Sequence, residues 1–250
     1  MVPSGRFGQI ASILPDCPST QDVLRAAAGS AAPEGFCVLA DFQSEGRGRL
    51  GRGWTAAPGQ CLLMSLLLRP RTPPERLAGI SLVAGIAVAE AMPVPARVKW
   101  PNDVVIDGAK VAGILAELEL PPGGDPFVLL GIGVNVNVPA TDLPPTERLP
   151  ATSLLVETGA LLDRLSLFGD IIDRLQAAYG EFEELGLRGL RDRWDALDDL
   201  RDRPLSVQLG GRVVEGRGAG IDDDGRLLVV DDDDAIHRID SGEVTAVRAD

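Results

Sequence analysis

Three arginines and four glycines share one short segment, residues 46–54, which reads GRGRLGRGW. Arg47, Arg49 and Arg52 each carry a planar, permanently charged guanidinium that can donate paired hydrogen bonds to a carboxylate or a phosphate. The glycines between them remove side-chain bulk, so the backbone can approach a ligand closely. Ordering such a segment costs entropy, which ligand contacts must offset. We therefore predict an anion-binding loop that orders over its ligand; a flexible, solvated basic loop is the alternative.

The same segment contains the spacing G-x-G-x-x-G, at Gly46, Gly48 and Gly51, which is typical of dinucleotide-binding turns. Such a turn needs a helix directly after the glycines, because the pyrophosphate lies at that helix's N-terminus. Here the chain continues as RGWTAAPGQ and then as an apolar run, CLLMSLLLR, that predicts a strand. The pattern therefore disfavours a dinucleotide site and leaves the arginines as the chemical feature.

A second polar cluster lies in the stretch RVKWPNDVVIDGAKVAGILAE. Lys99, Asn102, Asp103 and Lys110 place two cations, an amide and a carboxylate around one predicted hairpin, a set that suits a polyphosphate with its metal. An ordinary turn with surface lysines is the alternative. A third motif, GIGVNVN at residues 131–137, puts glycines inside a predicted strand, where they indicate close approach of a ligand or another backbone.

Apolar periodicity and turn residues predict the elements that must position these side chains. Helices are expected over residues 19–30, 74–92, 163–185 and 187–200, with the Ser19 or Thr20 side chain capping the first helix and Pro74 near the start of the second. Strands are expected over 35–43, 61–69, 96–100, 103–120 and 125–138, with a hairpin turn at Asp107-Gly108 and a proline-rich mobile loop over 139–152. After Arg203-Pro204, five short strands separated by tight turns predict a small β-barrel. The fold class is therefore α+β.

Composition and charge exclude several classes of protein. The chain has 250 residues and a formal net charge of −13, which argues against a general nucleic-acid binder but permits a local cationic pocket. The longest apolar segment, Ile80–Met92, is too short and too polar to span a bilayer. No secretory leader is evident, and three cysteines without a C-x-x-C motif suit a reducing compartment as small buried residues. We expect a cytoplasmic protein with no membrane partner.

Two further features carry no predicted site. The single histidine, His237, weakens any histidine-based triad or metal cluster and is expected on an exposed strand. The acidic runs at residues 222–224 and 231–234 are expected to be solvated turns, because they lack the ligand spacing of a calcium loop.

Taken together, the motifs closely resemble those of biotin protein ligases, also called biotin–[acetyl-CoA-carboxylase] ligases. They span about residues 17 to 248 in order: STQ (19–21), DFQSEGRGRLGRGW (41–54), KWPNDV (99–104), KVAGILAE (110–117), GIGVNVN (131–137) and GEVTAVR (242–248). The resemblance implies a catalytic domain over residues 1–202, with a central mixed β-sheet and helices, and a small SH3-like β-barrel over residues 203–250.

The resemblance also implies the reaction. Biotin and ATP would form biotinoyl-5′-AMP and pyrophosphate, with Mg²⁺ as the metal. A lysine of a biotin carboxyl carrier domain, part of acetyl-CoA or acyl-CoA carboxylase or of pyruvate carboxylase, would then attack the mixed anhydride and release AMP. Neither nucleic acid nor a membrane is expected as a partner. About eighteen residues precede STQ, so we expect a ligase without an N-terminal DNA-binding domain.

The resemblance assigns roles to individual residues of this sequence by their positions in the matching motifs. The resemblance assigns biotin binding to Ser19, Thr20, Gln21, Gln43, Gly46, Arg47, Gly48, Arg49, Lys110 and Gly113. It assigns the nucleotide to Arg49, Arg52, Trp54, Lys99, Asn102, Asp103 and Asn135, with Lys110 and Arg49 as the catalytic residues. Asp103 is a candidate metal ligand, the segment 139–150 matches an adenylate-binding loop, and Glu243 and Arg248 resemble residues that link the barrel to the active site.

Two alternatives remain open from the sequence. The first is a lipoate or octanoate ligase or transferase on a related fold, whose long acyl chain has less need for polar contacts such as those of Gln43. The second is a non-catalytic sensor of biotin or nucleotide, which the presence of Lys110 disfavours.

Overall fold

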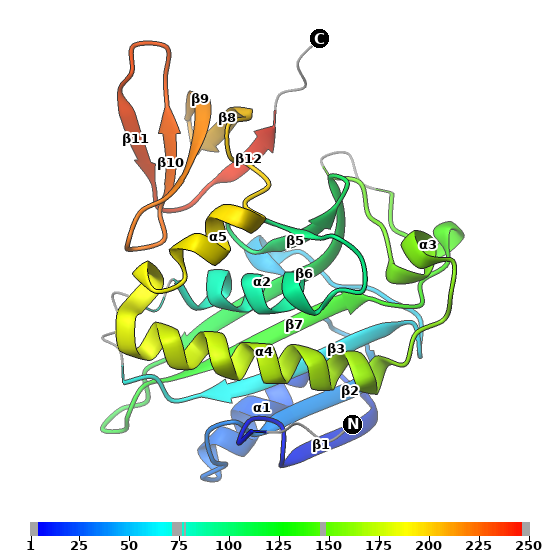
Figure 1. Ribbon diagram of the computed structural model, residues 1–250. Coiled ribbons are helices and arrows are strands. Elements are labelled where there is room, and N and C mark those ends of the chain that lie inside the picture. Colours follow the sequence, from blue (N-terminus) through cyan, green and yellow to red (C-terminus); the bar gives the residue numbers. More distant parts are fainter. Residues whose placement is uncertain (1–4, 72–76, 78, 146–148, 247–250) are drawn as a thin grey trace.

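The computed structural model describes residues 5–71, 77, 79–145 and 149–246. Its larger sheet has seven strands in the order β1-β2-β3-β7-β6-β5-β4 (Figure 1). The strands are β1 (Ala11–Cys17), β2 (Cys37–Gln43), β3 (Cys61–Leu68), β4 (Arg97–Lys99), β5 (Asp103–Ile106), β6 (Ala109–Glu119) and β7 (Phe127–Asn135). β1 and β2 are parallel and the other pairs are antiparallel, so the predicted mixed sheet is confirmed.

Alternation along β3 divides the two faces of this sheet, because successive strand residues point to opposite sides. Leu62, Met64, Leu66 and Leu68 join the main core. That core also holds α2 (Ile80–Ala91) and α4 (Arg164–Leu185), which pack together on this face (Figure 1). Leu67 points the other way, into the cluster under α1 (Thr20–Gly29). Leu63 shares that opposite face and packs beside Trp54.

The C-terminal part is a separate five-stranded antiparallel sheet in the order β11-β10-β9-β8-β12. Its strands are β8 (Pro204–Leu209), β9 (Arg212–Ile221), β10 (Leu227–Val230), β11 (Ile236–Ile239) and β12 (Glu243–Ala246). All five predicted strands are therefore confirmed. In the described residues the pairing runs openly from β11 to β12, so the expected closed barrel is here an open antiparallel sheet of the SH3-like domain. The described helices include none long and apolar enough to cross a bilayer.

The predicted turn at Asp107-Gly108 is confirmed, with both residues at positive φ, 48° and 79°. The acidic runs form tight turns, as expected: Oδ1 of Asp222 and of Asp231 each accept two backbone N–H bonds from the residues that follow. His237 lies on β11 and its Nε2 is 2.6 Å from Oδ2 of Asp231. The three cysteines are free and buried.

Several elements differ from the predictions. β1 was not predicted, because Pro15 and a half-exposed pattern hide an edge strand whose partner is distant in sequence. The described part of the second helix begins at Ile80, and residues 74–76 and 78 of its predicted range lie outside the described residues. β7 ends at Asn135 rather than residue 138.

The segment between β7 and the C-terminal sheet also departs from prediction. A short helix, α3 (Leu154–Thr158), precedes α4 and was missed. The proline-rich segment contains a 3₁₀ turn, η3 (Ala140–Asp142), and its residues 146–148 lie outside the described residues. The predicted helix over 187–200 is shorter: α4 ends at Leu185 with Gly186 as its C-cap, at φ 67°, and the chain then forms η4 (Gly186–Arg188) and α5 (Arg191–Leu197).

Candidate active site

A cavity of about 310 Å³ lies on the α1 face of the larger sheet. Fourteen of the predicted site residues line it: Ser19, Thr20, Gln21, Gln43, Arg47, Gly48, Arg49, Arg52, Trp54, Asn102, Asp103, Lys110, Gly113 and Asn135. They come from α1, from the ends of β2, β5 and β7, from β6, and from the segment after β2. A larger hollow of about 720 Å³ lies between the end of α2, the β4–β5 hairpin and α5, and none of the predicted site residues lines it.

One end of the cavity carries uncharged polar groups. Gln43, the last residue of β2, accepts hydrogen bonds at Oε1 from the Thr20 backbone N–H and hydroxyl, at 2.8 and 2.9 Å. The Thr20 hydroxyl also lies 2.8 Å from the hydroxyl of Ser65. Ser19 takes the N-cap position of α1, but its side chain makes no capping hydrogen bond, so that prediction is wrong in its detail. Ser19 is buried and lines the cavity.

The floor of the cavity is built from glycines on β6 and β7. A Cβ at Gly131 would lie 3.1 Å from the Gln21 side chain, and one at Gly133 would lie 2.7 Å from the Trp54 ring. A Cβ at Gly113 would lie 3.0 Å from the same ring. The clearance that these glycines were predicted to provide is therefore present, and two large site side chains occupy it.

The other end of the cavity is cationic. The Lys110 ammonium lies 2.6 Å from Oδ1 of Asp103 and 5.7 Å from the centre of the Trp54 ring. Arg49 donates from Nη1 to Oδ1 of Asn102 at 3.1 Å, and Asn102 in turn donates to the Ile114 carbonyl on β6. Burial lowers the pKa of Arg49, against the opposing charge of Asp103. Two fixed cations thus face one corner of the β4–β5 turn.

Residues 46–53, here called the lid, form a compact hairpin over this cavity. Gly48 N–H donates to the Arg52 carbonyl at 2.7 Å, and Trp54 N–H donates to the Gly46 carbonyl at 2.8 Å. The chain turns at η1 (Arg49–Gly51), where Leu50 has φ 58° and is exposed at the tip. A strand follows, so the dinucleotide interpretation is excluded here, as predicted. Gly46 itself lies at the base, where a Cβ would come 2.3 Å from the Trp54 carbonyl oxygen.

Lys99 does not line the cavity. Its side chain is half-buried and its ammonium donates to the carbonyl of Val244 on β12, at 2.9 Å. Burial lowers the pKa of Lys99, partly offset by the charges of Asp103 and Asp199. Lys99 thus joins the two sheets. Of the two C-terminal residues predicted to make this link, Glu243 of β12 pairs through its backbone with Gln208 of β8, and Arg248 lies outside the described residues.

Asn135 ends β7 at the cavity wall. Its Nδ2 donates to the Thr152 carbonyl at 2.9 Å, and its Oδ1 accepts from the Cys61 thiol at 3.5 Å. These bonds fix the amide and hold the end of the proline-rich loop against β3 and β7. Pro144, Leu149 and Ala151 from the same segment line the cavity.

Ser65 is a site residue that the sequence interpretation missed. It is fully buried, lines the cavity and lies within hydrogen-bonding distance of Thr20. A signal was present, because a lone hydroxyl inside the apolar run CLLMSLLL needs a partner when buried. Thr55 and Ile132 also line the cavity and were not predicted.

Carboxylates suited to a metal are few in this cavity. Within residues 5–71, 77, 79–145 and 149–246, no group of three or more His, Cys, Asp or Glu side chains could hold an ion together. Asp103 is the single carboxylate among the residues that line the cavity in the described part of the chain.

Comparison with known proteins decides the family. Residues 15–137 match the Biotin/lipoate A/B protein ligase family, and residues 202–245 match the Biotin protein ligase C terminal domain. The bifunctional ligase/repressor BirA of Bacillus subtilis is 33% identical over 235 residues, which cover 90% of this chain and 70% of that protein. The chain belongs to the biotin protein ligase family. The prediction from its motifs is confirmed.

Two further similarities extend over both sheets. The biotin–[acetyl-CoA-carboxylase] ligase of Mycobacterium tuberculosis is 34% identical over 216 residues, which cover 83% of this chain and 78% of that protein. A biotin protein ligase from Aquifex aeolicus, solved in complex with biotin and ATP, is 30% identical with a TM-score of 0.80, and the match covers 96% of this chain and 100% of that one.

Proposed function

We propose that this member of the biotin protein ligase family activates biotin with ATP as biotinoyl-5′-AMP and transfers the biotinoyl group to a lysine of a biotin carboxyl carrier domain. The observation that carries the proposal is one cavity with an uncharged polar end, a cationic end and an arginine lid between them. The two ends match the two ends of an acyl-adenylate whose acyl group has a polar ring.

The polar end suits the ureido ring of biotin. Gln43, Thr20 and Ser65 offer an amide and two hydroxyls in one hydrogen-bonded chain, so donors and acceptors are both present. Met64 and Ile132 also line the cavity and provide apolar wall for the rest of the molecule. Such a combination of apolar wall and a few placed polar groups is typical of small-molecule sites.

The cationic end suits the first step, in which the biotin carboxylate attacks the α-phosphorus of ATP and pyrophosphate leaves. Two unit charges about 4 Å apart repel by roughly 4 kcal/mol at an effective dielectric near 20. Fixed cations around both oxygens offset that repulsion and stabilise the charge that grows at phosphorus. Lys110 and Arg49 have the charge and the position for this role. No protein nucleophile is needed, because the mixed anhydride is already activated.

Magnesium is proposed to enter with the nucleotide. The donor set fits an ion held mainly by phosphate oxygens, since Mg²⁺ commonly takes one or two carboxylates plus substrate phosphates and water. Asp103 is the carboxylate that would touch it, and Asn102 and Arg52 line the same end for the nucleotide. When bound, the ion would neutralise charge on the leaving pyrophosphate.

The lid is proposed to protect the intermediate from water until the carrier arrives. In the second step the neutral carrier amine attacks the acyl carbon, the bond to the phosphate oxygen breaks, and AMP leaves. The segment 139–150 is proposed to cover the adenylate, because Pro144 and Leu149 line the cavity. We retain the division into a catalytic domain, residues 1–202, and a C-terminal domain, residues 203–250.

A lipoate or octanoate ligase is the second candidate, since the matching family model includes lipoate ligases. The polar end disfavours it, because a dithiolane or an alkyl chain would leave the groups around Gln43 without partners. A non-catalytic sensor is disfavoured by Lys110, which stands in the cavity wall where activation needs a cation.

Transfer to a purified carrier domain tests the proposal. The protein, MgATP and the carrier are incubated with labelled biotin or labelled lipoate, and a carrier whose acceptor lysine is changed to arginine serves as the control. We expect ATP-dependent label from biotin on the intact carrier alone. Label from lipoate would establish the second candidate, and binding of biotin without pyrophosphate release would establish a sensor.

A further inference from the structure

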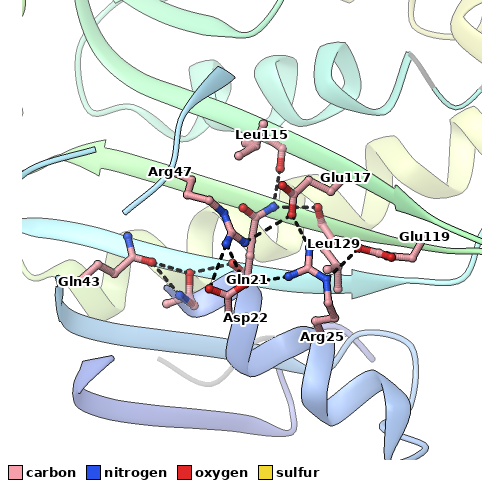
Figure 2. A network of polar contacts seen from close by, with 11 residues as sticks. Gln21, Asp22, Arg25, Gln43, Arg47, Leu115, Glu117, Glu119 and Leu129 are labelled. Atoms are coloured by element: carbon pink, nitrogen blue, oxygen red, sulfur yellow. Dashed lines mark hydrogen bonds and ion pairs between the residues drawn. The ribbon is translucent and has the colours of Figure 1, made fainter. Parts of the chain in front are cut away.

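The Arg47 side chain belongs to an ion-pair network between α1 and β6 (Figure 2). Its Nη1 lies 2.7 Å from Oδ1 and 2.9 Å from Oδ2 of Asp22, and its Nη2 lies 3.6 Å from Oε2 of Glu117. Arg25 shares both carboxylates, at 2.8 Å each, and also binds Glu119 at 2.8 Å. The network therefore joins the lid to two elements outside it, α1 and β6.

The lid is held from two sides by different arginines. Arg49 reaches inward to Asn102 at the corner after β4, whereas Arg47 reaches outward to Asp22 in the first turn of α1. The two anchors flank Gly48: Arg47 pairs with Gly53 across the hairpin, and Arg49 begins the turn η1. Release of the outer anchor would leave the lid tied to the rest of the molecule mainly through Arg49 and the backbone at its base.

Asp22 is well placed to connect this anchor to the ligand. It directly follows Thr20 and Gln21, which line the cavity. Thr20 binds Gln43, and Gln21 donates to the carbonyls of Leu115 and Leu129 across β6 and β7 (Figure 2). The start of α1 is thereby fixed to the sheet on its inner side, so Asp22 offers the lid a rigid carboxylate.

The strength of the anchor is limited by solvent. The Arg47 and Asp22 side chains are 36% and 42% exposed, and ion pairs of that exposure contribute little singly and are screened by salt. The network contains three carboxylates and two arginines and therefore has a net negative charge. This charge favours the bound position of the Arg47 side chain. Such a contact can hold a loop closed and still open within a catalytic cycle.

We propose that Asp22, assisted by Glu117, is a positioning residue that clasps the lid through Arg47 while the acyl-adenylate is bound. The proposal rests on the proposed function, since the ligand is its intermediate. Asp22 touches no reacting atom in this scheme. Its contribution is to the lifetime of the closed state, and hence to how long biotinoyl-AMP stays in the cavity.

The test measures release of preformed, labelled biotinoyl-AMP into a chase of unlabelled intermediate. The variants are Asp22→Asn, Arg47→Gln and both together. We expect each single variant to release the intermediate about three- to tenfold faster, as for the loss of a few exposed ion pairs. The double variant should match the singles, because both remove one contact. Wild-type release should accelerate from about 0.05 M to about 0.5 M KCl, and Asp22→Asn release should depend less on salt.

Glu119→Gln is the matched control. It makes the same carboxylate-to-amide change in the same network, but Glu119 contacts Arg25 and makes no recorded contact with the lid. It should release the intermediate at the wild-type rate, and thermal melts of all variants separate lid effects from unfolding. Three results would contradict the proposed role of Asp22 in holding the lid closed. They are additive effects in the double variant, a release rate that does not depend on salt, and equal acceleration of release by Glu119→Gln. Failure of the wild-type protein to form biotinoyl-AMP would instead overturn the proposed function.

Discussion

Lys110 and Asp103 form a close ion pair in the wall of the cavity, with the ammonium 2.6 Å from Oδ1. They come from adjacent strands, β6 and β5, on either side of the turn at Asp107-Gly108. The carboxylate holds the ammonium at the cationic end, where the reacting carboxylate and phosphate are proposed to meet. The fixed position matters, because a preorganised charge needs no reorganisation as the transition state forms.

The first prediction concerns that ammonium. Lys110→Ala should slow pyrophosphate release by roughly 10²–10³-fold, the usual cost of losing one preorganised group that stabilises transition-state charge. Lys110→Arg, which keeps the charge, should retain part of the rate. Single-turnover pyrophosphate release is the measurement. A near-normal rate for Lys110→Ala would remove Lys110 from its proposed role.

The second prediction concerns the inner anchor of the lid. Arg49→Ala removes the hydrogen bond to Asn102 and a half-buried cation from the end of the cavity proposed to hold the acyl phosphate. We expect the variant to fold, to form biotinoyl-AMP slowly and to lose it into solution. Chromatography of the protein-free filtrate would detect the escaped intermediate. Normal retention of biotinoyl-AMP by the Arg49→Ala variant would contradict the proposal that Arg49 holds the lid closed.

The third prediction concerns the clearance on β7. Gly133→Ala would place a Cβ 2.7 Å from the Trp54 ring and force the indole out of position. We expect the KM for ATP to rise by about tenfold or more, since small displacements of positioning groups are costly. Gly180→Ala is the matched control, because its Cβ would meet nothing within 4 Å on the exposed face of α4. It should leave the KM unchanged and stabilise the helix by about 0.5–1 kcal/mol.

The fourth prediction concerns two buried thiols. Burial raises the pKa of Cys37 and of Cys61 to about 12, from an ordinary 9.0. At pH 9 about half of an unfolded thiol is thiolate, against roughly one part in a thousand for these two in the folded protein. Iodoacetamide should therefore label them only through unfolding, as peptide mass spectrometry with and without urea would show.

The same shift gives a stability prediction with a defined sign. The folded protein keeps these protons to a higher pH than the unfolded chain, so folding stability is lost as pH rises from 9 toward 12. Cys37→Ala should reduce that alkaline loss, although the cavity it leaves lowers stability at neutral pH. Urea titrations at several pH values measure both effects; an alkaline slope unchanged in the variant would contradict the assignment.

Local rules predicted most of the elements. Apolar runs on either side of Asp107-Gly108 and the unbroken run at residues 61–68 specified their strands directly. The strand β1 could not be predicted, because its stability comes from parallel pairing with β2, which begins twenty residues later, beyond α1. The residues ASILPDC contain no local pattern that indicates this pairing. The helix predicted over 187–200 is confirmed only over Arg191–Leu197, because Gly186 and Gly189 interrupt the helical period that the apolar residues suggest.

Site residues were predictable where several motifs converged on one chemistry. The lid arginines, Lys110 and Asn102 all reached the cavity from distant parts of the sequence. Lys99 belongs to the same motif as Asn102, yet its ammonium reaches the carbonyl of Val244 in the C-terminal sheet, whereas Asn102 lies in the turn between β4 and β5 and lines the cavity. The partners of Arg47 could not be predicted, since Asp22 and Glu117 are ordinary surface acids until the fold places them together.

Residues 99–103, at the turn between β4 and β5, also determine how the two domains could be recombined. Lys99 and Trp100 donate to the C-terminal sheet, while Asn102 and Asp103 hold the cavity cations. Both acceptors on the C-terminal side are main-chain carbonyls, those of Val244 and Gly225, which any residue supplies. The contact therefore constrains the path of the C-terminal backbone, and apolar side chains of that sheet such as Leu227 and Val229 belong to the main core. A C-terminal domain grafted from a relative should work if it keeps that path and that apolar face, whatever the sequence of its solvent-exposed side.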